Sequence, residues 1–292
     1  MSKKWIYYSV YPGKEAYLDE VVIKIVGDTF RELTACQSVH RWFFIRYVDF
    51  EGYHVRLRFQ VDDAVEDMYA EKLERRIHTL MDTILSGSAP QIRRLLPMGN
   101  NKNESERESA VRREEYEPEY EKYGGTLGVS LSEICFESSS RLALAGLEAE
   151  SNEVIDRFHL ALLIMGETAK QAKLSASEQK ELWNRILHFW SGADYPEGVH
   201  YKESFQNAAS KRIESLQRSL QNYKQNESIA EMMDDYRFHL KDVFEQIRGS
   251  KQIRLPASHF VFHYIHMMNN RLGIWPMEEA YLGALLAAVG KS

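Results

Sequence analysis

Residues 54–61, HVRLRFQV, alternate strictly between polar and apolar side chains. Side chains on a β-strand point to opposite faces with a period of two, so this pattern predicts a strand with one apolar face packed on a core. The other face carries His54, Arg56, Arg58 and Gln60. Two guanidinium groups therefore project from the same face. A chain with this segment is constrained to build a sheet in its first third.

The segments before this strand predict more strands and one helix. Residues 5–11 are aromatic or β-branched and end at a Pro-Gly pair, as a strand followed by a turn would. Apolar residues at helical spacing predict a helix over residues 17–33, with an interruption near Gly27. Residues 41–48 begin with Arg41 and are otherwise apolar on both faces apart from Arg46, which predicts a central strand. A turn follows at residues 49–52.

The segments after the alternating strand are more varied. Asp62 and Asp63 are predicted to cap a helix that ends near Leu85. Residues 91–98, QIRRLLPM, are a further candidate strand. Residues 99–113 are polar with almost no large apolar side chains, and we expect them to form a mobile loop.

From Ser130 onward the apolar residues recur three or four apart, which predicts helices almost to the C-terminus. The predicted helices span residues 130–148, 152–172, 177–191, 203–224, 228–248, 257–271 and 277–289. We therefore predict an α+β fold, with an antiparallel or mixed sheet from the N-terminal third packed against a mostly helical remainder, in a single domain over residues 1–292.

Composition narrows the functional classes. Charged residues make up 27% of the chain and the formal net charge is −6, so the bulk electrostatics favour neither nucleic acid nor an anionic membrane as a partner. No window approaches the 18 apolar residues that a membrane span needs, and no secretory signal pattern is present. Cys36 and Cys135 are about a hundred residues apart without a paired motif, which favours neither a disulfide nor a zinc knuckle. We expect a cytoplasmic protein.

The row His54, Arg56 and Arg58 is the first candidate for chemistry. Guanidinium groups present fixed forks of donors that match carboxylate or phosphate oxygens, so two on one face could bind an oxyanion. The alternative is that the row is the solvent face of an edge or meander strand. The spacing alone does not decide between them.

A second candidate is residues 116–125, YEPEYEKYGG. Tyrosines interleaved with glutamates give many polar tips, a proline fixes part of the backbone, and the Gly-Gly pair permits a positive φ or a close approach. The alternative is a solvated loop that leads into the next helix.

The third candidate is the imidazole row on the predicted helix over residues 257–271. His259, His263 and His266 follow one another at i, i+4 and i+7, on one helix face, and Asn270 continues that face. No H-E-x-x-H motif or carboxylate ligand accompanies them, so we expect no metal site. A buried histidine face is the alternative to a general acid or base.

Motifs for nucleotide-dependent and α/β-hydrolase chemistry are absent from the sequence, and we expect no cofactor. The segments FFIRY (43–47), HVRLRF (54–59), YEPEYEKYGG (116–125) and HMMNNR (266–271), together with the opening WIYY, resemble the ordered motifs of the C-terminal elimination domain of class I lantibiotic dehydratases. Stand-alone versions of that domain occur in thiopeptide biosynthesis.

This resemblance implies a lyase that acts on the leader and core of a ribosomally made precursor peptide. In the family, a larger domain glutamylates Ser or Thr side chains, and the elimination domain expels glutamate to leave dehydroalanine or dehydrobutyrine. This chain is too short for both, so we expect a separate glutamylating dehydratase subunit as a partner.

The resemblance also assigns roles to residues. It implies that Arg56, Arg58 and His266 are catalytic, and we expect them to meet around one peptide-sized cavity. Residues of the same motifs are predicted to bind the substrate: His54, Glu119, Lys122, Tyr123, Asn270 and Arg271. The family usually has arginine at the position of Lys122, and lysine keeps the charge but loses the bidentate fork.

Two alternatives stay open at this point. Another branch of the family joins two dehydroalanines by a formal [4+2] cycloaddition that forms the pyridine of thiopeptide macrocycles. The other alternative is a non-catalytic scaffold that binds a leader peptide, for example as a strand added to a sheet edge.

Overall fold

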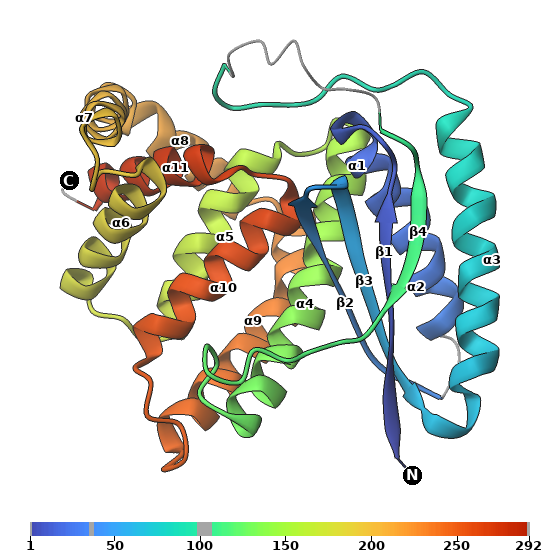
Figure 1. Ribbon diagram of the computed structural model, residues 1–292. Coiled ribbons are helices and arrows are strands. Elements are labelled where there is room, and N and C mark those ends of the chain that lie inside the picture. Colours follow the sequence, from blue (N-terminus) through green and yellow to red (C-terminus); the bar gives the residue numbers. More distant parts are fainter. Residues whose placement is uncertain (1, 35–37, 98–106, 291–292) are drawn as a thin grey trace. The chain divides into compact units, whose positions relative to one another are not determined.

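The computed structural model describes residues 2–34, 38–97 and 107–290 (Figure 1). The chain forms two compact units, Met1–Glu119 and Tyr120–Ser292. The first unit contains a four-stranded sheet with helices, and the second is helical. The predicted α+β class is confirmed.

The sheet of the first unit is antiparallel, with the strand order β2-β3-β1-β4. Its strands are β1 (Lys3–Tyr11), β2 (Val39–Asp49), β3 (Gly52–Asp62) and β4 (Ala110–Glu114). The alternating segment is therefore the inner strand β3, joined to β2 by a tight turn. The register places Arg58 opposite Tyr7 of β1 on one side and Phe43 of β2 on the other.

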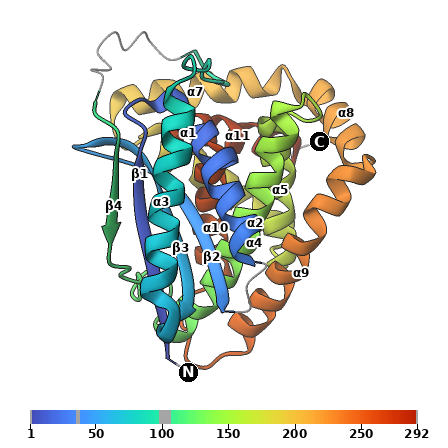
Figure 2. The same ribbon diagram turned by 90° about the vertical axis from the view of Figure 1, so that its right-hand side faces the viewer.

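Helices cover the apolar face of this sheet (Figure 2). They are α1 (Leu18–Glu20), a π-helical turn (Val21–Val26), α2 (Gly27–Thr34) and α3 (Glu66–Leu85). Val55, Leu57 and Phe59 of β3 are at most 1% exposed and form the core with neighbouring apolar strand residues. The polar face of β3 is thereby directed away from these helices.

The prediction of a central position for residues 41–48 is wrong, because β2 is an outer strand of the described sheet. Its side chains are nevertheless apolar on both faces for a structural reason. Trp42 stacks on Phe30 of α2 with ring centroids 4.3 Å apart. Phe43 on the opposite face contacts the rings of Trp5 and Tyr116 at 5.2 and 5.7 Å. Because aromatic side chains cover both faces of β2, an outer strand here has the apolar pattern that is typical of a central strand.

The structure refines two local predictions in the first unit. The irregularity expected near Gly27 is a π-helical turn over Val21–Val26, and the backbone of Gly27 itself is helical, so the helix continues through it. Asp62 and Asp63 do not cap α3 with their side chains. Asp63 instead lies 2.8 Å from the Lys4 ammonium and accepts a hydrogen bond from the Ser2 hydroxyl, so a long-range ion pair replaces the local cap.

Residues 91–97 contain no strand, so that part of the prediction is wrong, and residue 98 lies outside the described residues. The predicted loop over residues 99–113 is wrong at its C-terminal end, where residues 110–113 belong to β4. Arg112 pairs with Ser9 in the ladder between β4 and β1, and its guanidinium donates to Glu51. Long-range pairing therefore makes a strand from a polar sequence. Residues 99–106 lie outside the described residues.

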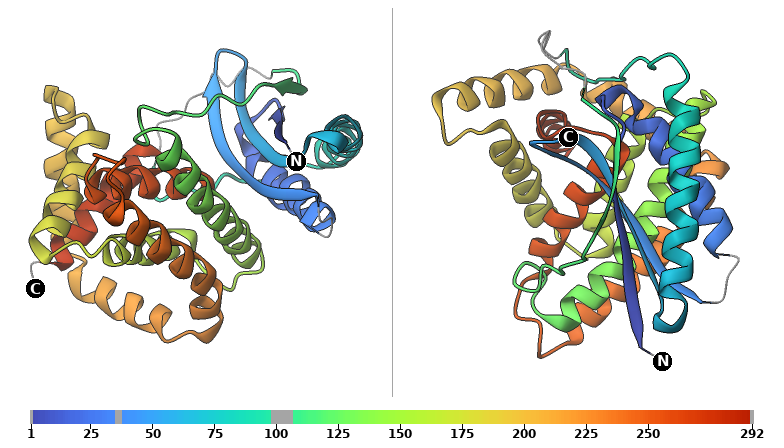
Figure 3. Two further views of the ribbon diagram at one scale, coloured as in Figure 1. Left: turned by 90° about the horizontal axis from the view of Figure 1, so that it is seen from below. Right: turned by 45° about the vertical axis from the view of Figure 1, so that its right-hand side comes forward.

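The second unit is a set of packed helices (Figure 3). They are α4 (Thr126–Ser151), α5 (Arg157–Gln171), α6 (Ala176–Ser191), α7 (Pro196–Ser210), α8 (Ile213–Lys224), α9 (Glu227–Gly249), α10 (Ala257–Leu272) and α11 (Pro276–Val289). Helix α10 packs on α4, α5 and α6, and α6 packs closely on α11. The apolar periodicity from Ser130 onward is thus confirmed as helical.

The single helix predicted over residues 203–224 is two helices in the structure. Helix α7 begins earlier, with Pro196 in its first turn, and the chain leaves helical geometry at Arg212 before α8 begins. The break falls between two polar helices without a Gly or Pro to mark it, so periodicity alone did not reveal it.

Within the described part of the chain, no helix is long and apolar enough to cross a membrane. The same residues contain no cluster of three or more His, Cys, Asp or Glu side chains that could hold a metal ion. Cys135 is buried in α4, whereas Cys36 lies outside the described residues.

Candidate functional site

The polar face of β3 is largely buried, which contradicts its interpretation as a solvent face. His54 is 0% exposed and Arg58 is 7% exposed, while Arg56 is half-buried. The inner position of β3 explains this burial, because aromatic side chains from β1 and β2 flank the row on both sides. Two guanidinium groups consequently lie in a partly dry, aromatic environment.

Arg58 lies among three aromatic rings. Its guanidinium carbon is 4.3 Å from the ring centroid of Tyr7, 5.1 Å from that of Tyr116 and 5.3 Å from that of Phe43. Rings at these distances attract a cation through their negative faces. Tyr116 reaches this position from the segment that follows β4, which the sequence had placed in its second candidate motif.

Arg58 has no carboxylate partner among residues 2–34, 38–97 and 107–290, and its buried Nε has no hydrogen-bond partner there. Burial lowers the pKa of Arg58, but a guanidinium stays protonated in proteins. A buried charge is costly unless it is paired. The arrangement therefore has the properties of a site for an anionic ligand.

Arg56 is held differently. Its Nε donates to Nε2 of His54 over 3.1 Å, and its guanidinium carbon lies 3.6 Å from the ring centroid of Tyr47. Nδ1 of His54 lies 3.1 Å from the backbone oxygen of Gly52. Burial lowers the pKa of His54 below its usual value, and the charge of Arg56 acts in the same direction. His54 is thus a neutral, buried imidazole that contacts Arg56.

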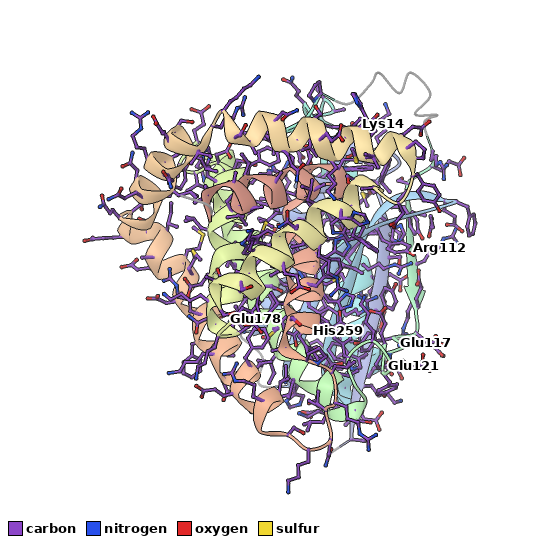
Figure 4. The ribbon with its side chains drawn as sticks, turned by 90° about the vertical axis from the view of Figure 1, so that its left-hand side faces the viewer. Lys14, Arg112, Glu117, Glu121, Glu178 and His259 are labelled. Carbon is purple, nitrogen blue, oxygen red and sulfur yellow. The ribbon has the colours of Figure 1, made fainter. Side chains whose placement is uncertain are left out.

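The segment over residues 116–125 is neither fully solvated nor fully buried. Tyr116 and Tyr123 pack inside their own units, whereas Glu119 is exposed. Glu117 and Glu121 are exposed as well (Figure 4). Its Gly-Gly pair has positive φ values of 74° and 91° and leads directly into α4, as the sequence indicated.

The structure surrounds His266 of α10 with two side chains that the sequence analysis did not identify. Nδ1 of His266 lies 3.0 Å from Oε2 of Glu279 in α11, and its ring stacks on Trp190 of α6 with centroids 4.3 Å apart. The indole Nε1 of Trp190 donates to the other oxygen of Glu279 over 3.0 Å. Glu279 is 0% exposed, whereas about a quarter of the His266 side chain is exposed (27%).

This geometry fixes the chemistry that His266 can perform. A carboxylate that accepts from Nδ1–H holds the imidazole in one tautomer, so Nε2 carries the lone pair, as in carboxylate–histidine pairs of hydrolases. Glu279 lies in the first turn of α11, where the positive end of the helix dipole stabilises an anion. His266 can therefore act as a general base through Nε2.

The other two histidines of α10 are packed with Lys122 and Tyr123. Nε2 of His259, at the start of α10, lies 2.8 Å from the backbone oxygen of Lys122 (Figure 4). Tyr123 is 2% exposed and its ring lies 6.2 Å from that of His263. Burial, followed by the charge of Lys122, lowers the pKa of His263 to about 3, so this imidazole is neutral.

Asn270 and Arg271 lie on different sides of the last turn of α10. Asn270 is half-buried, and Arg271 is 0% exposed. The Arg271 guanidinium donates to the Ser140 hydroxyl of α4 over 3.0 Å and to the backbone oxygen of Met267 over 2.9 Å. These contacts tie α10 to α4, which favours a structural role for Arg271 over contact with a substrate.

Each unit thus brings together one part of the predicted site. The first unit unites His54, Arg56 and Arg58, and the second unites Lys122 and Tyr123 with the imidazole face of α10. Tyr7, Glu279 and Trp190 were not among the candidates from the sequence, and Tyr116 was named only as part of the segment 116–125. Their contacts with Arg58 and His266 are long-range in sequence, so local spacing does not indicate them.

The α+β fold thus presents a buried guanidinium in the first unit and a carboxylate-held imidazole in the second. The chain belongs to the family described as "Lantibiotic biosynthesis dehydratase C-term", whose family model matches residues 5–289. The match extends across both compact units.

Several solved structures have a similar fold. One is the tRNA-dependent lantibiotic dehydratase MibB from Microbispora sp. 107891, with a TM-score of 0.69, 17% identity and 99% of this chain covered. This chain spans 28% of MibB. The pyridine synthase TbtD from thiomuracin biosynthesis has a TM-score of 0.71 and 15% identity, over 98% of this chain and 97% of TbtD.

A third similar structure is TsrL, with a TM-score of 0.62 and 14% identity, over 98% of this chain and 93% of TsrL. These likenesses describe the fold. A search of curated proteins found no match.

Proposed function

We propose that this protein is a lyase that expels glutamate from glutamylated Ser or Thr side chains of a ribosomally made precursor peptide. The observation that carries the proposal is Arg58, a buried guanidinium for which the described residues provide no carboxylate. A departing glutamate is a carboxylate of the required charge. The family membership supports a role in peptide antibiotic biosynthesis.

In the proposed reaction, a base removes the Cα proton, the Cα=Cβ double bond forms, and the Cβ–O bond breaks with its electron pair leaving on the glutamate carboxylate. Arg58 and Arg56 bind this carboxylate and stabilise the charge that develops on it. Nε2 of His266 accepts the proton, and Glu279 stabilises the resulting imidazolium. The products are glutamate and dehydroalanine or dehydrobutyrine.

The remaining motif residues have supporting roles in this proposal. Lys122 and Tyr123 bind the peptide beside the imidazole face of α10, and Glu119 and Asn270 bind it through polar contacts. We assign no substrate contact to Arg271. Residues 1–292 act as one functional domain in the cytoplasm and receive the glutamylated peptide from a separate glutamylating subunit.

Cycloaddition is the second candidate. It is favoured by the likeness to the pyridine synthase TbtD over nearly the whole of both chains, and by Lys122 in place of the arginine usual in the family. That reaction joins two dehydroalanines and needs no site for a glutamate carboxylate. Arg58 therefore distinguishes the two reactions.

Mass spectrometry of two synthetic peptides tests the assignment. One peptide carries O-glutamyl serine, and the other is a linear peptide with two dehydroalanines. We expect the first to be dehydrated and the second to be unchanged. An intact glutamyl adduct, with conversion of the second peptide to a macrocycle, would assign the cycloaddition instead.

Three variants complete this experiment. Arg58→Met should abolish dehydration, and Arg75→Met, at a 72% exposed arginine of α3, should leave it unchanged. Normal binding of the peptide and full product formation by Arg58→Met and by His266→Ala would indicate a scaffold without catalysis.

A further inference from the structure

We propose that His54 is a positioning residue: as a neutral imidazole protonated on Nδ1, it fixes the guanidinium of Arg56 and leaves both Nη groups to a carboxylate ligand. The resemblance to the dehydratase family implied that His54 binds the substrate. Its side chain is 0% exposed, however, and its ring nitrogens are occupied by Gly52 and Arg56. The identity of the ligand rests on the proposed function, but the role of His54 does not.

The hydrogen bonds define the protonation state. The partner of Nδ1 is a backbone oxygen, which only accepts, so Nδ1 must carry a proton. The partner of Nε2 is Nε–H of Arg56, which only donates, so Nε2 must carry a lone pair. A second proton on the ring would place an N–H donor on Nε2 opposite the Nε–H donor of Arg56, and the hydrogen bond between them would be lost. The geometry therefore requires a neutral imidazole in one tautomer.

The surroundings hold this imidazole in place. Its ring packs on that of Tyr11 with centroids 4.2 Å apart, and Tyr11 donates its hydroxyl proton to Asp49 over 3.0 Å. Asp49 also accepts from the backbone nitrogens of Glu51 and Gly52, so the turn that supplies the Gly52 oxygen is itself fixed. Strands β1, β2 and β3 thus all contribute to the position of one ring.

Arg56 is consequently restrained at two points. The bond from Nε to His54 fixes the plane of the guanidinium, and the ring of Tyr47 lies 3.6 Å from its carbon. In the described residues, no carboxylate forms an ion pair with Arg56. A planar fork held in this way is organised in advance for bidentate binding, and this lowers the cost of ordering the side chain when a ligand arrives.

Charged groups around His54 act in opposite directions on its protonation. Asp49, whose Oδ2 lies 3.9 Å from Nε2, and Glu114 of β4 favour the protonated ring, whereas Arg56 disfavours it. Burial is the largest influence and also disfavours the charge. Tyr11 is uncharged near neutrality, because burial and its bond to Asp49 raise its pKa. The neutral form of His54 is therefore favoured at pH 7.

Nitrogen-15 NMR of the wild-type chain tests the tautomer without any variant or substrate. We expect the ring signals of His54 to report a neutral imidazole with the proton on Nδ1 at pH 7, and the same state at pH 6.5, where a histidine in an unfolded chain is about half protonated. A proton on Nε2, or a doubly protonated ring at pH 7, would overturn the proposal.

Substitutions test the effect on Arg56. His54→Leu removes the acceptor and should slow the elimination of O-glutamyl serine by about 100-fold, because the fork is no longer held. His54→Gln offers an amide oxygen to Nε–H of Arg56 and should restore most of the rate. In the background Arg56→Met, His54→Leu should cause no further loss, since His54 acts through Arg56.

The outcomes separate this proposal from the proposed function. If His54→Leu slows elimination by the same factor in the wild-type chain and in the Arg56→Met variant, His54 only stabilises the fold. A wild-type chain that never eliminates glutamate would refute the proposed reaction. The NMR result would still decide the tautomer and the contact with Arg56.

Discussion

Replacing Arg58 with Met should make the protein more stable while it abolishes turnover. The desolvation of a buried ion costs several kcal/mol, and the described residues offer no carboxylate to offset it. Attraction by the rings of Tyr7, Tyr116 and Phe43 returns about 0.5–2 kcal/mol each. Met has a similar length and packs well on aromatic rings. We expect the free energy of unfolding to rise by about 1–3 kcal/mol.

Urea denaturation followed by tryptophan fluorescence measures this change, and Arg46 provides the matched control. Arg46 is also buried, at 8% exposed, but its guanidinium lies 2.7 Å from a carboxylate oxygen of Asp19. Arg46→Met should therefore lower the free energy of unfolding by about 1.5–3 kcal/mol, as the loss of a charge-assisted hydrogen bond does. If Arg58→Met lowers the free energy of unfolding as Arg46→Met does, the buried guanidinium of Arg58 stabilises the fold, contrary to this prediction.

Three further predictions concern the second unit. Glu279→Gln should slow elimination by two to four powers of ten, since an amide no longer holds His266 in the productive tautomer, and an unchanged kcat would contradict this role. The pKa of His263 is lowered to about 3 in the folded chain. Between about pH 6.5 and pH 3 this histidine is therefore protonated in the unfolded chain but not in the folded chain. The free energy of unfolding should consequently fall as the pH falls through this range. His263→Leu should weaken that fall, and acid titrations that superimpose on the wild type would argue against it. Gly128→Ala should lower the free energy of unfolding by about 3 kcal/mol or more, because the new Cβ would lie 1.6 Å from a backbone oxygen. As the control, Gly166→Ala in α5 places its Cβ where no atom lies within 4 Å, and it should raise the free energy of unfolding by about 0.5–1 kcal/mol. Equal melting temperatures of the two variants in calorimetry would contradict both expectations.

Local patterns predicted those features of the fold that depend on local geometry. The alternation in residues 54–61 identified both faces of β3, because the period of two belongs to every extended chain. Helical periodicity likewise located most of α4 to α11. Strand order depends instead on pairing between distant segments, so the outer position of β2 and the existence of β4 were missed.

The candidate site likewise has residues that the local sequence predicted and partners that it did not. The paired guanidinium groups could be read from β3 alone, because both residues lie two apart on one strand. The partners that determine what these groups do come from elsewhere in the chain. Tyr7 reaches Arg58 from β1, and Tyr116 reaches it from the segment that follows β4. Glu279 reaches His266 from the next helix, 13 residues away in sequence. The family resemblance implied that His54 binds the substrate, and its complete burial is what led us to propose a positioning role instead.

The most direct test of the account follows the two products of a peptide with O-glutamyl serine. Elimination predicts glutamate and dehydroalanine in equal amounts, with a slower reaction when the serine Cα carries deuterium, because a base must break that bond. Release of glutamate with unmodified serine would instead show hydrolysis of the ester. That result would contradict the assignment of Arg58 and His266 to an elimination reaction.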